Sequence, residues 1–75
     1  MEEFIKEEIK KLCFKKVDID DELFESGILD SITAVDLAVA LEEKYNIKIP
    51  FVDINEQHFK TINAMVNYLQ IKTKA

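Results

Sequence analysis

The chain has 75 residues, a formal net charge of −5 and a single cysteine. This length allows one domain, residues 1–75, whose small core must come from well-formed helices, because a lone cysteine excludes an intrachain disulfide. The first residues lack the basic patch and apolar segment of a secretion signal, and no apolar run reaches membrane-spanning length. We therefore expect a cytoplasmic protein that does not span a membrane.

The acidic residues are concentrated in one part of the chain. Residues 17–45 contain nine acidic residues and one lysine, whereas residues 1–16 and 46–75 carry small positive net charges. Such a field repels nucleic acid and anionic lipid and attracts basic protein surfaces. We therefore expect no nucleic-acid partner. A solvated acidic loop is the alternative, but we favour a segment that faces basic protein partners.

The first segment predicts an amphipathic helix over about residues 2–15. Glutamates lie in its first turn and lysines near its end, an order that suits the helix dipole. Its apolar residues recur at helical spacing and predict a core-facing stripe that includes the cysteine. The stripe consists of Phe4, Ile5, Ile9, Leu12 and Cys13.

Residues 16–30 lack a sustained helical stripe and predict a long ordered loop. Gly27 is the only glycine in the chain and predicts a tight turn with positive φ. Six apolar side chains are expected to attach this loop to the core. They are Val17, Ile19, Leu23, Phe24, Ile28 and Leu29.

A second main helix is predicted from Ser31 to about Tyr45, with Asp30 as its N-cap. It carries two apolar stripes. The first suits the core and consists of Ala34, Leu37, Ala38, Leu41 and Tyr45. The second consists of Ile32, Val35 and Val39.

The second stripe allows two interpretations. Either loop 16–30 covers it, or it stays partly exposed within an acidic rim, which is typical of a docking surface. We favour docking, because so small a chain leaves little material to cover it. The predicted docking residues are Ile32, Val35, Asp36, Val39, Glu42 and Glu43.

The last third of the chain predicts a connector and two more helices. Residues 45–51 alternate apolar and polar side chains and are expected to be extended. Asp53 and Glu56 have capping-box spacing and predict a short helix that ends near Phe59. Thr61 is the expected cap of a final helix. Together these elements predict an all-α fold, a small right-turning bundle of three main helices plus one short helix.

Ser31 is placed as an attachment point rather than as a nucleophile. It stands at the positive end of a helix beside Asp30, with no histidine or lysine nearby in sequence to activate it, and the Gly-x-Ser-x-Gly elbow is missing. His58, the only histidine, is expected at the surface or in a cap. A calcium loop counted from Asp18 lacks its glycine and closing glutamate. We expect no catalytic residue and no metal site.

The residues around Ser31 resemble the acyl carrier protein family. The resemblance rests on residues 30–37 and 40–45, on Ile49-Pro50 and on residues 60–69, and so covers nearly the whole chain. It implies a 4′-phosphopantetheine arm, derived from coenzyme A, on Ser31, with Asp30 as the adjacent motif residue. Free amides and the helix dipole would stabilise the phosphodiester. The chain would then be a monomer that partner enzymes use as a cosubstrate, not an enzyme itself.

The resemblance also implies the partners. They are a phosphopantetheinyl transferase, and either an adenylating ligase or acyltransferases and synthases with basic patches. Residues 23–31 are similar to the D-alanyl carrier protein of teichoic acid modification. Thr33 and Lys44 replace acids common in fatty-acid carriers, whereas Ile62 replaces a proline usual in the D-alanyl type. We favour an aminoacyl or specialised carrier. A fatty-acid carrier and an unmodified acidic interaction module are the alternatives.

Overall fold

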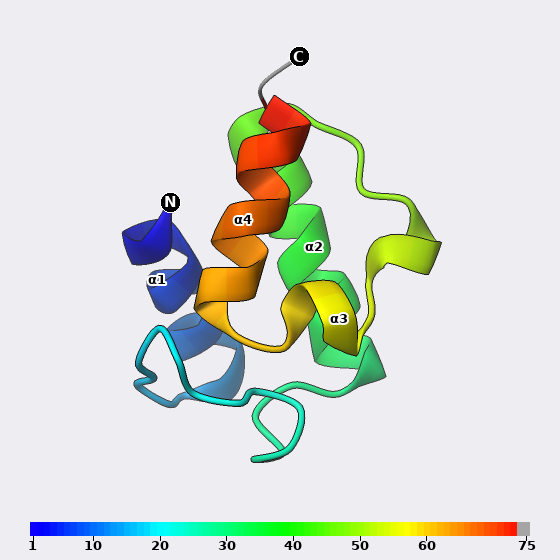
Figure 1. Ribbon diagram of the computed structural model, residues 1–75. Coiled ribbons are helices and arrows are strands. Elements are labelled where there is room, and N and C mark those ends of the chain that lie inside the picture. Colours follow the sequence, from blue (N-terminus) through cyan, green and yellow to red (C-terminus); the bar gives the residue numbers. More distant parts are fainter. Residues whose placement is uncertain (74–75) are drawn as a thin grey trace.

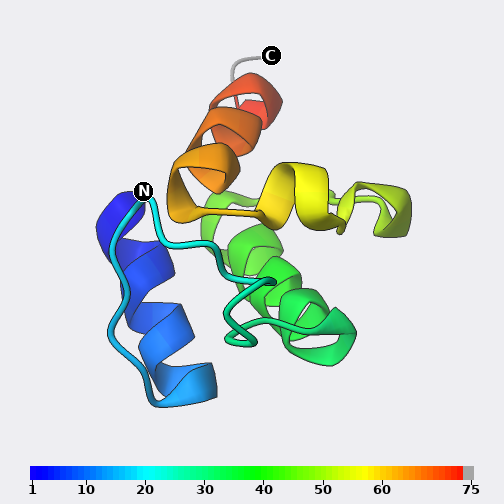
Figure 2. The ribbon, with the colours of Figure 1, turned by 60° about the horizontal axis from the view of Figure 1, so that its bottom comes forward.

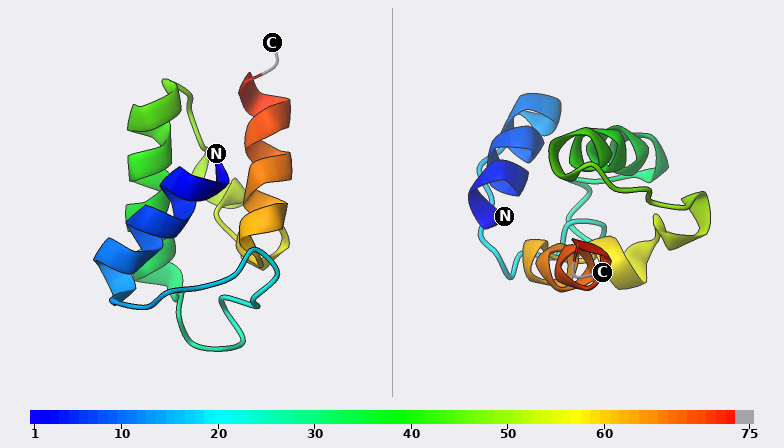
Figure 3. Two further views of the ribbon diagram at one scale, coloured as in Figure 1. Left: turned by 90° about the vertical axis from the view of Figure 1, so that its left-hand side faces the viewer. Right: turned by 90° about the horizontal axis from the view of Figure 1, so that it is seen from above.

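The computed structural model describes residues 1–73 and is all-helical within them. In Figure 1, α4 lies in front of α2, and α1 packs against both of them. The view in Figure 3 shows α1 crossing the other two at an angle. The predicted all-α bundle of three main helices and one short helix is confirmed. The elements are α1 (Glu2–Cys13), α2 (Ser31–Tyr45), the 3-10 helix η1 (Phe51–Asp53), α3 (Glu56–Phe59) and α4 (Ile62–Thr73).

One hydrophobic core joins the helices and the loop. The predicted inner stripe of α2 is confirmed, since its first four members are buried and Tyr45 packs half-buried against the core. Residues from α1, α3 and α4 complete this core, Ile5, Phe59 and Met65 among them. Across residues 1–73, no helix has the length and apolar character needed to cross a bilayer.

The long loop between α1 and α2 is attached to the core as predicted. Val17, Leu23 and Leu29 are buried, and the other three predicted anchors are half-buried against the core. The Leu23 N–H donates to the Lys60 carbonyl at 2.8 Å, which ties the loop to the segment before α4. Gly27 adopts the predicted positive φ, at 81°. These contacts fix the path of the chain into α2.

The first helix ends two residues earlier than expected. Phe14, expected inside the helix, adopts a left-handed conformation with φ 56°, and its N–H donates to the Lys10 carbonyl. A residue in this conformation terminates a helix, because its backbone no longer continues the right-handed spiral. The ring of Phe14 consequently turns away from the apolar stripe and is 89% exposed.

The start of α3 differs from the prediction. Asn55, not Asp53, is the N-cap, and its Oδ1 accepts a hydrogen bond from the His58 N–H at 3.0 Å. Asp53 lies in η1, where its Oδ2 accepts a hydrogen bond from the Tyr68 hydroxyl at 2.6 Å. The prediction was wrong because a tertiary partner in α4 holds this carboxylate away from the helix start.

The other predictions for this part of the chain hold. The Thr61 Oγ1 accepts a hydrogen bond from the Ala64 N–H at 3.0 Å, as expected of a cap for α4. The connector before η1 turns Ile47 and Ile49 towards the core and leaves Lys48 exposed. The connector thus contributes core side chains without forming regular structure.

Candidate functional site

Ser31 is the first residue of α2, and it is exposed. Asp30 precedes it as the N-cap, and its Oδ1 accepts hydrogen bonds from the Ile32 N–H at 3.0 Å and the Thr33 N–H at 2.9 Å. The Thr33 Oγ1 accepts from the Asp30 N–H at 2.8 Å and lies 3.0 Å from Asp30 Oδ1, to which it can donate. This reciprocal capping box confirms Asp30 as the cap and fixes the backbone on which Ser31 stands.

The electrostatics at this helix end are set mainly by Asp30. Hydrogen bonds from the Thr33 N–H and hydroxyl, and then from the Ile32 N–H, hold the pKa of the Asp30 carboxyl below its ordinary value. The carboxylate therefore stays ionised at neutral pH. It accepts hydrogen bonds from two amides at the helix start, which are then not free to bind an anion on Ser31. Such an anion would meet the positive end of the dipole, but beside a negative charge.

His58 belongs to a separate cluster. Its ring packs on the ring of Tyr68 in α4, with the centroids 4.6 Å apart and the planes tilted by 42°. Tyr68 in turn donates its hydroxyl hydrogen bond to Asp53. This packing gives His58 a structural role between α3 and α4, rather than a place as a base beside Ser31.

Cys13 is half-buried, and its thiol donates to the Ile28 carbonyl at 3.1 Å. Burial first, and then the negative charge of Asp30, raise the pKa of this thiol. A raised pKa keeps the sulfur protonated and poorly nucleophilic. Cys13 therefore fits its predicted place in the apolar stripe of α1, and it links the end of α1 to the loop that leads to Ser31.

The outer face of α2 leaves apolar side chains in solvent. Ile32 is 72% exposed and Val39 is 47% exposed, so loop 16–30 does not cover them. Asp36 and Glu43 are exposed as well, whereas Val35 is half-buried. We call the four exposed residues, Ile32, Asp36, Val39 and Glu43, the α2 surface.

Glu42, the remaining predicted docking residue, has a contact within the fold. Its Oε2 accepts a hydrogen bond from the Ile49 N–H at 2.8 Å, and the residue is half-buried. The chain turns back after α2 through Asn46, in a left-handed conformation, and this turn brings the connector alongside Glu42. The carboxylate of Glu42 therefore anchors the connector.

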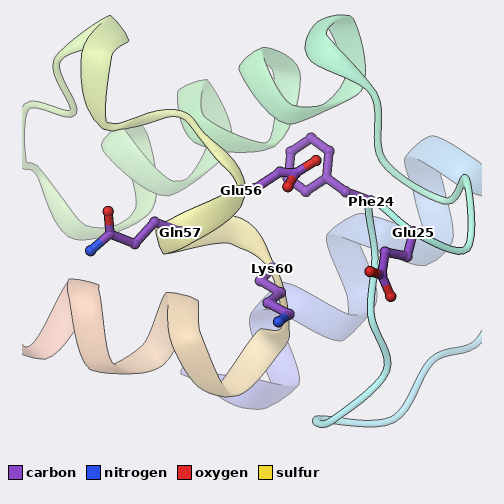
Figure 4. Close-up of a pocket in the computed structure, with 5 residues that line it drawn as sticks. All are labelled: Phe24, Glu25, Glu56, Gln57 and Lys60. Atoms are coloured by element: carbon purple, nitrogen blue, oxygen red, sulfur yellow. The ribbon is translucent and has the colours of Figure 1, made fainter.

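A pocket of about 250 Å³ lies between the loop and the start of α3. Figure 4 shows Phe24 and Glu25 on its loop side and Glu56, Gln57 and Lys60 on its helical side. The Lys60 Nζ lies 3.3 Å from Glu22 Oε1. A hydrogen bond with Glu22, and the charge of Glu22, raise the pKa of Glu25.

Four of the five residues that line this pocket are polar or charged, and the fifth is aromatic. The pocket has no signal in the sequence, because its two sides come from segments about thirty residues apart. Within residues 1–73, histidine, cysteine, aspartate and glutamate form no group of three or more that could hold a metal ion.

Comparison with known proteins identifies the family. The model of the family described as "Phosphopantetheine attachment site" matches residues 3–69. The chain is similar to the D-alanyl carrier protein of Leuconostoc citreum (strain KM20), at 42% identity over 48 residues, which is 64% of this chain and 62% of that protein. It is also similar to the D-alanyl carrier protein of Streptococcus suis (strain 05ZYH33), at 30% identity over 67 residues, which is 89% of this chain and 77% of that protein.

The match to the Leuconostoc protein spans less than two thirds of that relative, whereas the family model covers nearly the whole of this chain. The exposed serine at a well-capped helix start, with exposed apolar side chains beside it, suits a residue that a modifying enzyme must reach. From the family match and the relatives together, the chain belongs to the phosphopantetheine attachment-site family, whose prosthetic group is 4′-phosphopantetheine.

Proposed function

We propose that this chain is a carrier protein in which Ser31 bears the 4′-phosphopantetheine arm, and that its cargo is an aminoacyl group, D-alanine. The observation that supports this most directly is the position of Ser31. Its hydroxyl is exposed at the first residue of a helix whose start is fixed by the Asp30 capping box. A fixed helix start presents the hydroxyl in one orientation to a transferase, without providing a base of its own.

The residues around Ser31 have separate roles. Asp30 and Thr33 hold the helix start, so the phosphodiester on Ser31 lies at the positive end of the α2 dipole. The ionised Asp30 would repel that phosphate, which favours a role for its charge during transfer from coenzyme A rather than in the modified protein. The attached arm supplies a terminal thiol that can hold an acyl or aminoacyl group as a thioester.

The names of the relatives favour an aminoacyl cargo. Both relatives described above are D-alanyl carrier proteins, and one of them is 30% identical over 89% of this chain. We therefore place the fatty-acid carrier second.

The α2 surface is the proposed contact with partner enzymes. Ile32 and Val39 offer apolar area next to Ser31, and Asp36 and Glu43 add negative charge for basic patches on a transferase, a ligase or an acyltransferase. Carrier domains act through such enzymes, so the chain itself needs no catalytic group.

Intact-mass measurement tests the attachment site. The unmodified protein is incubated with coenzyme A and a phosphopantetheinyl transferase of broad specificity. Wild type and Ser26→Ala, the matched control at the only other serine, should each gain one arm, and Ser31→Ala should gain none. An unmodified wild type, under conditions that load a known carrier, would contradict the proposal and favour the unmodified interaction module.

A second measurement tests the cargo. The arm-bearing protein is offered to a D-alanine-activating ligase with ATP and D-alanine and, separately, to a fatty acyl–carrier protein synthetase with a long-chain fatty acid. We expect the mass of D-alanine to be added in the first reaction and little acylation in the second. The reverse result would assign the chain to fatty-acid metabolism and leave the attachment site unaffected.

A further inference from the structure

The C-terminal end of α1 carries a large apolar side chain that neither the core nor the Ser31 site uses. Phe14 is 89% exposed, and its backbone is left-handed with φ 56°. Glycine or asparagine normally occupies this position at a helix end, because a bulky side chain is disfavoured in the left-handed conformation. Phe14 therefore gains little for folding, either from burial or from its backbone conformation.

Lysines surround this ring in sequence. Lys10 and Lys11 lie in the last turn of α1, and Lys15 and Lys16 follow Phe14; all four are exposed. Lys11 lies 3.3 Å from the Glu8 carboxylate, but its side chain remains 74% exposed. Among residues 1–73, the other three have no carboxylate oxygen within 4.0 Å. We call Phe14 and these four lysines the Phe14 surface.

A groove adjoins this surface. It has a volume of about 290 Å³ and runs along α1. Lys10 and Lys16 line it together with Lys6, and Glu3, Glu7 and Val17 complete the lining. Two lysines of the Phe14 surface thus also face a hollow with room for an anionic group.

We propose that the Phe14 surface binds reversibly to an anionic lipid surface, with the Phe14 ring in the interface and the lysines on the lipid phosphates. Exposed aromatic rings partition to the boundary between headgroups and acyl chains, and neighbouring lysines add attraction to anionic lipid. In Figure 2 the end of α1 projects at one corner of the molecule. A protruding side chain suits a fluid interface, which closes around it without a preformed pocket.

The net charge of −5 opposes binding to anionic lipid, but distance limits its effect. The molecule measures 32 × 23 × 19 Å, and exposed charges are screened beyond about 8 Å at physiological ionic strength. The charges at the contacting corner therefore dominate the interaction. Because the acidic loop begins close to this corner, we expect weak binding that depends strongly on salt.

The location of the surface gives this binding a use. The Cys13 thiol contacts the Ile28 carbonyl, so the end of α1 lies against the segment that leads to Ser31. Figure 3 shows the end of α1 and the start of α2 at the same end of the molecule. Lipid binding would therefore hold Ser31, and an arm attached to it, close to the membrane surface. This use rests on the proposed function, whereas the binding itself does not.

Tryptophan fluorescence of the unmodified protein tests the binding directly. The chain has no tryptophan, so Phe14→Trp introduces a single reporter. We expect its emission to shift to shorter wavelength with vesicles of phosphatidylglycerol and to remain unchanged with phosphatidylcholine. Phe51→Trp is the matched control, since Phe51 is 75% exposed on η1, away from the lysine cluster, and should not shift.

Co-sedimentation with the same vesicles tests the individual residues. Phe14→Asn suits the left-handed backbone, so it should fold at least as well as wild type and yet bind about tenfold more weakly. Lys15→Gln and Lys16→Gln should each weaken binding about fivefold, the factor that corresponds to about 1 kcal/mol for each basic residue near an anionic surface. Lys48→Gln, at an exposed lysine of the connector, should have little effect.

Three results with vesicles would overturn the proposal. They are unchanged Phe14→Trp emission with phosphatidylglycerol, equal binding to both lipids, and undiminished sedimentation of Phe14→Asn. A Phe14→Trp shift with soluble polyglutamate as large as that with vesicles would also overturn it, and would assign the surface to an acidic protein partner. None of these measurements requires the arm on Ser31, so they fail or succeed independently of the proposed function.

Discussion

The hydrogen bond from Tyr68 to Asp53 joins η1 to the middle of α4, and its removal should weaken the whole fold. The Tyr68 hydroxyl lies 2.6 Å from Asp53 Oδ2, and Tyr68 is only 8% exposed. A hydrogen bond to a charged group contributes about 1.5–3 kcal/mol. Because the half-exposed Asp53 can bind water once its partner is lost, we expect Tyr68→Phe to cost about 1.5 kcal/mol, the lower end of that range.

Urea unfolding followed by far-UV circular dichroism measures this cost. For a domain of this size, about 1.5 kcal/mol corresponds to a Tm decrease of roughly 6–12 °C. Asp53→Ala and the double variant complete a thermodynamic cycle, in which we expect a coupling free energy near 1 kcal/mol. Tyr45→Phe is the control, because Tyr45 is half-buried and should lose less than about 0.5 kcal/mol. Additive single effects, or a Tyr68→Phe variant as stable as wild type, would refute this reasoning.

The same bond predicts an alkaline effect. Burial first, and then the hydrogen bond and charge of Asp53, raise the pKa of Tyr68 far above its ordinary value of about 10. The folded state keeps this proton, while the unfolded state loses it above about pH 10. The contribution to stability is therefore complete below that pH and declines above it. Tyr68→Phe should unfold with a shallower alkaline decline, and equal slopes in the two proteins would contradict this.

Three further outcomes can be measured. Gly27→Ala should lose about 1–2 kcal/mol in urea unfolding from its positive φ alone, since an added β-carbon would meet no atom within 4 Å; Gly27→Asn should lose less. Asp30→Ala should lower the Tm, whereas Asp30→Asn should keep the helix cap. Because the folded pKa of Asp30 is depressed, the stabilisation by its carboxylate is present above about pH 4 and is lost as the pH falls. The stability of Asp30→Asn should therefore decline less steeply in acid than that of wild type. The association rate constant with the phosphopantetheinyl transferase, measured by stopped flow, should fall as the salt concentration rises. Asp36→Asn should reduce that salt dependence. Rate constants independent of salt would exclude electrostatic steering.

Local patterns predicted the helices and the anchors of the loop well. The inner stripe of α2 was identified from its helical spacing, and the six loop side chains were identified because they are apolar residues among acidic ones. Both sets pack against the core, as these patterns predict. The Asp30 cap depends only on residues within one turn of it, and it was found for the same reason. Features fixed within a few residues were therefore accessible from the sequence.

Features that depend on distant partners were not accessible. Asp53 fits a capping box by spacing, but its carboxylate accepts the Tyr68 hydroxyl fifteen residues away. Glu42 fits an acidic rim, but the returning connector supplies the Ile49 N–H. The predicted helix extended past Phe14, but the left-handed backbone of Phe14 ends α1 and leaves its ring in solvent.

These observations together explain why α2 has more apolar residues than its core contact needs. The loop reaches the core through Leu23 and Leu29, both buried, and so covers the end of the bundle rather than the outer face of α2. The uncovered apolar area lies beside Ser31, and acidic side chains border it. One face of α2 thus belongs to the core, and the other is the contact that we propose for partner enzymes. Substitutions at Leu37 should therefore lower stability, whereas substitutions at Val39 should weaken recognition.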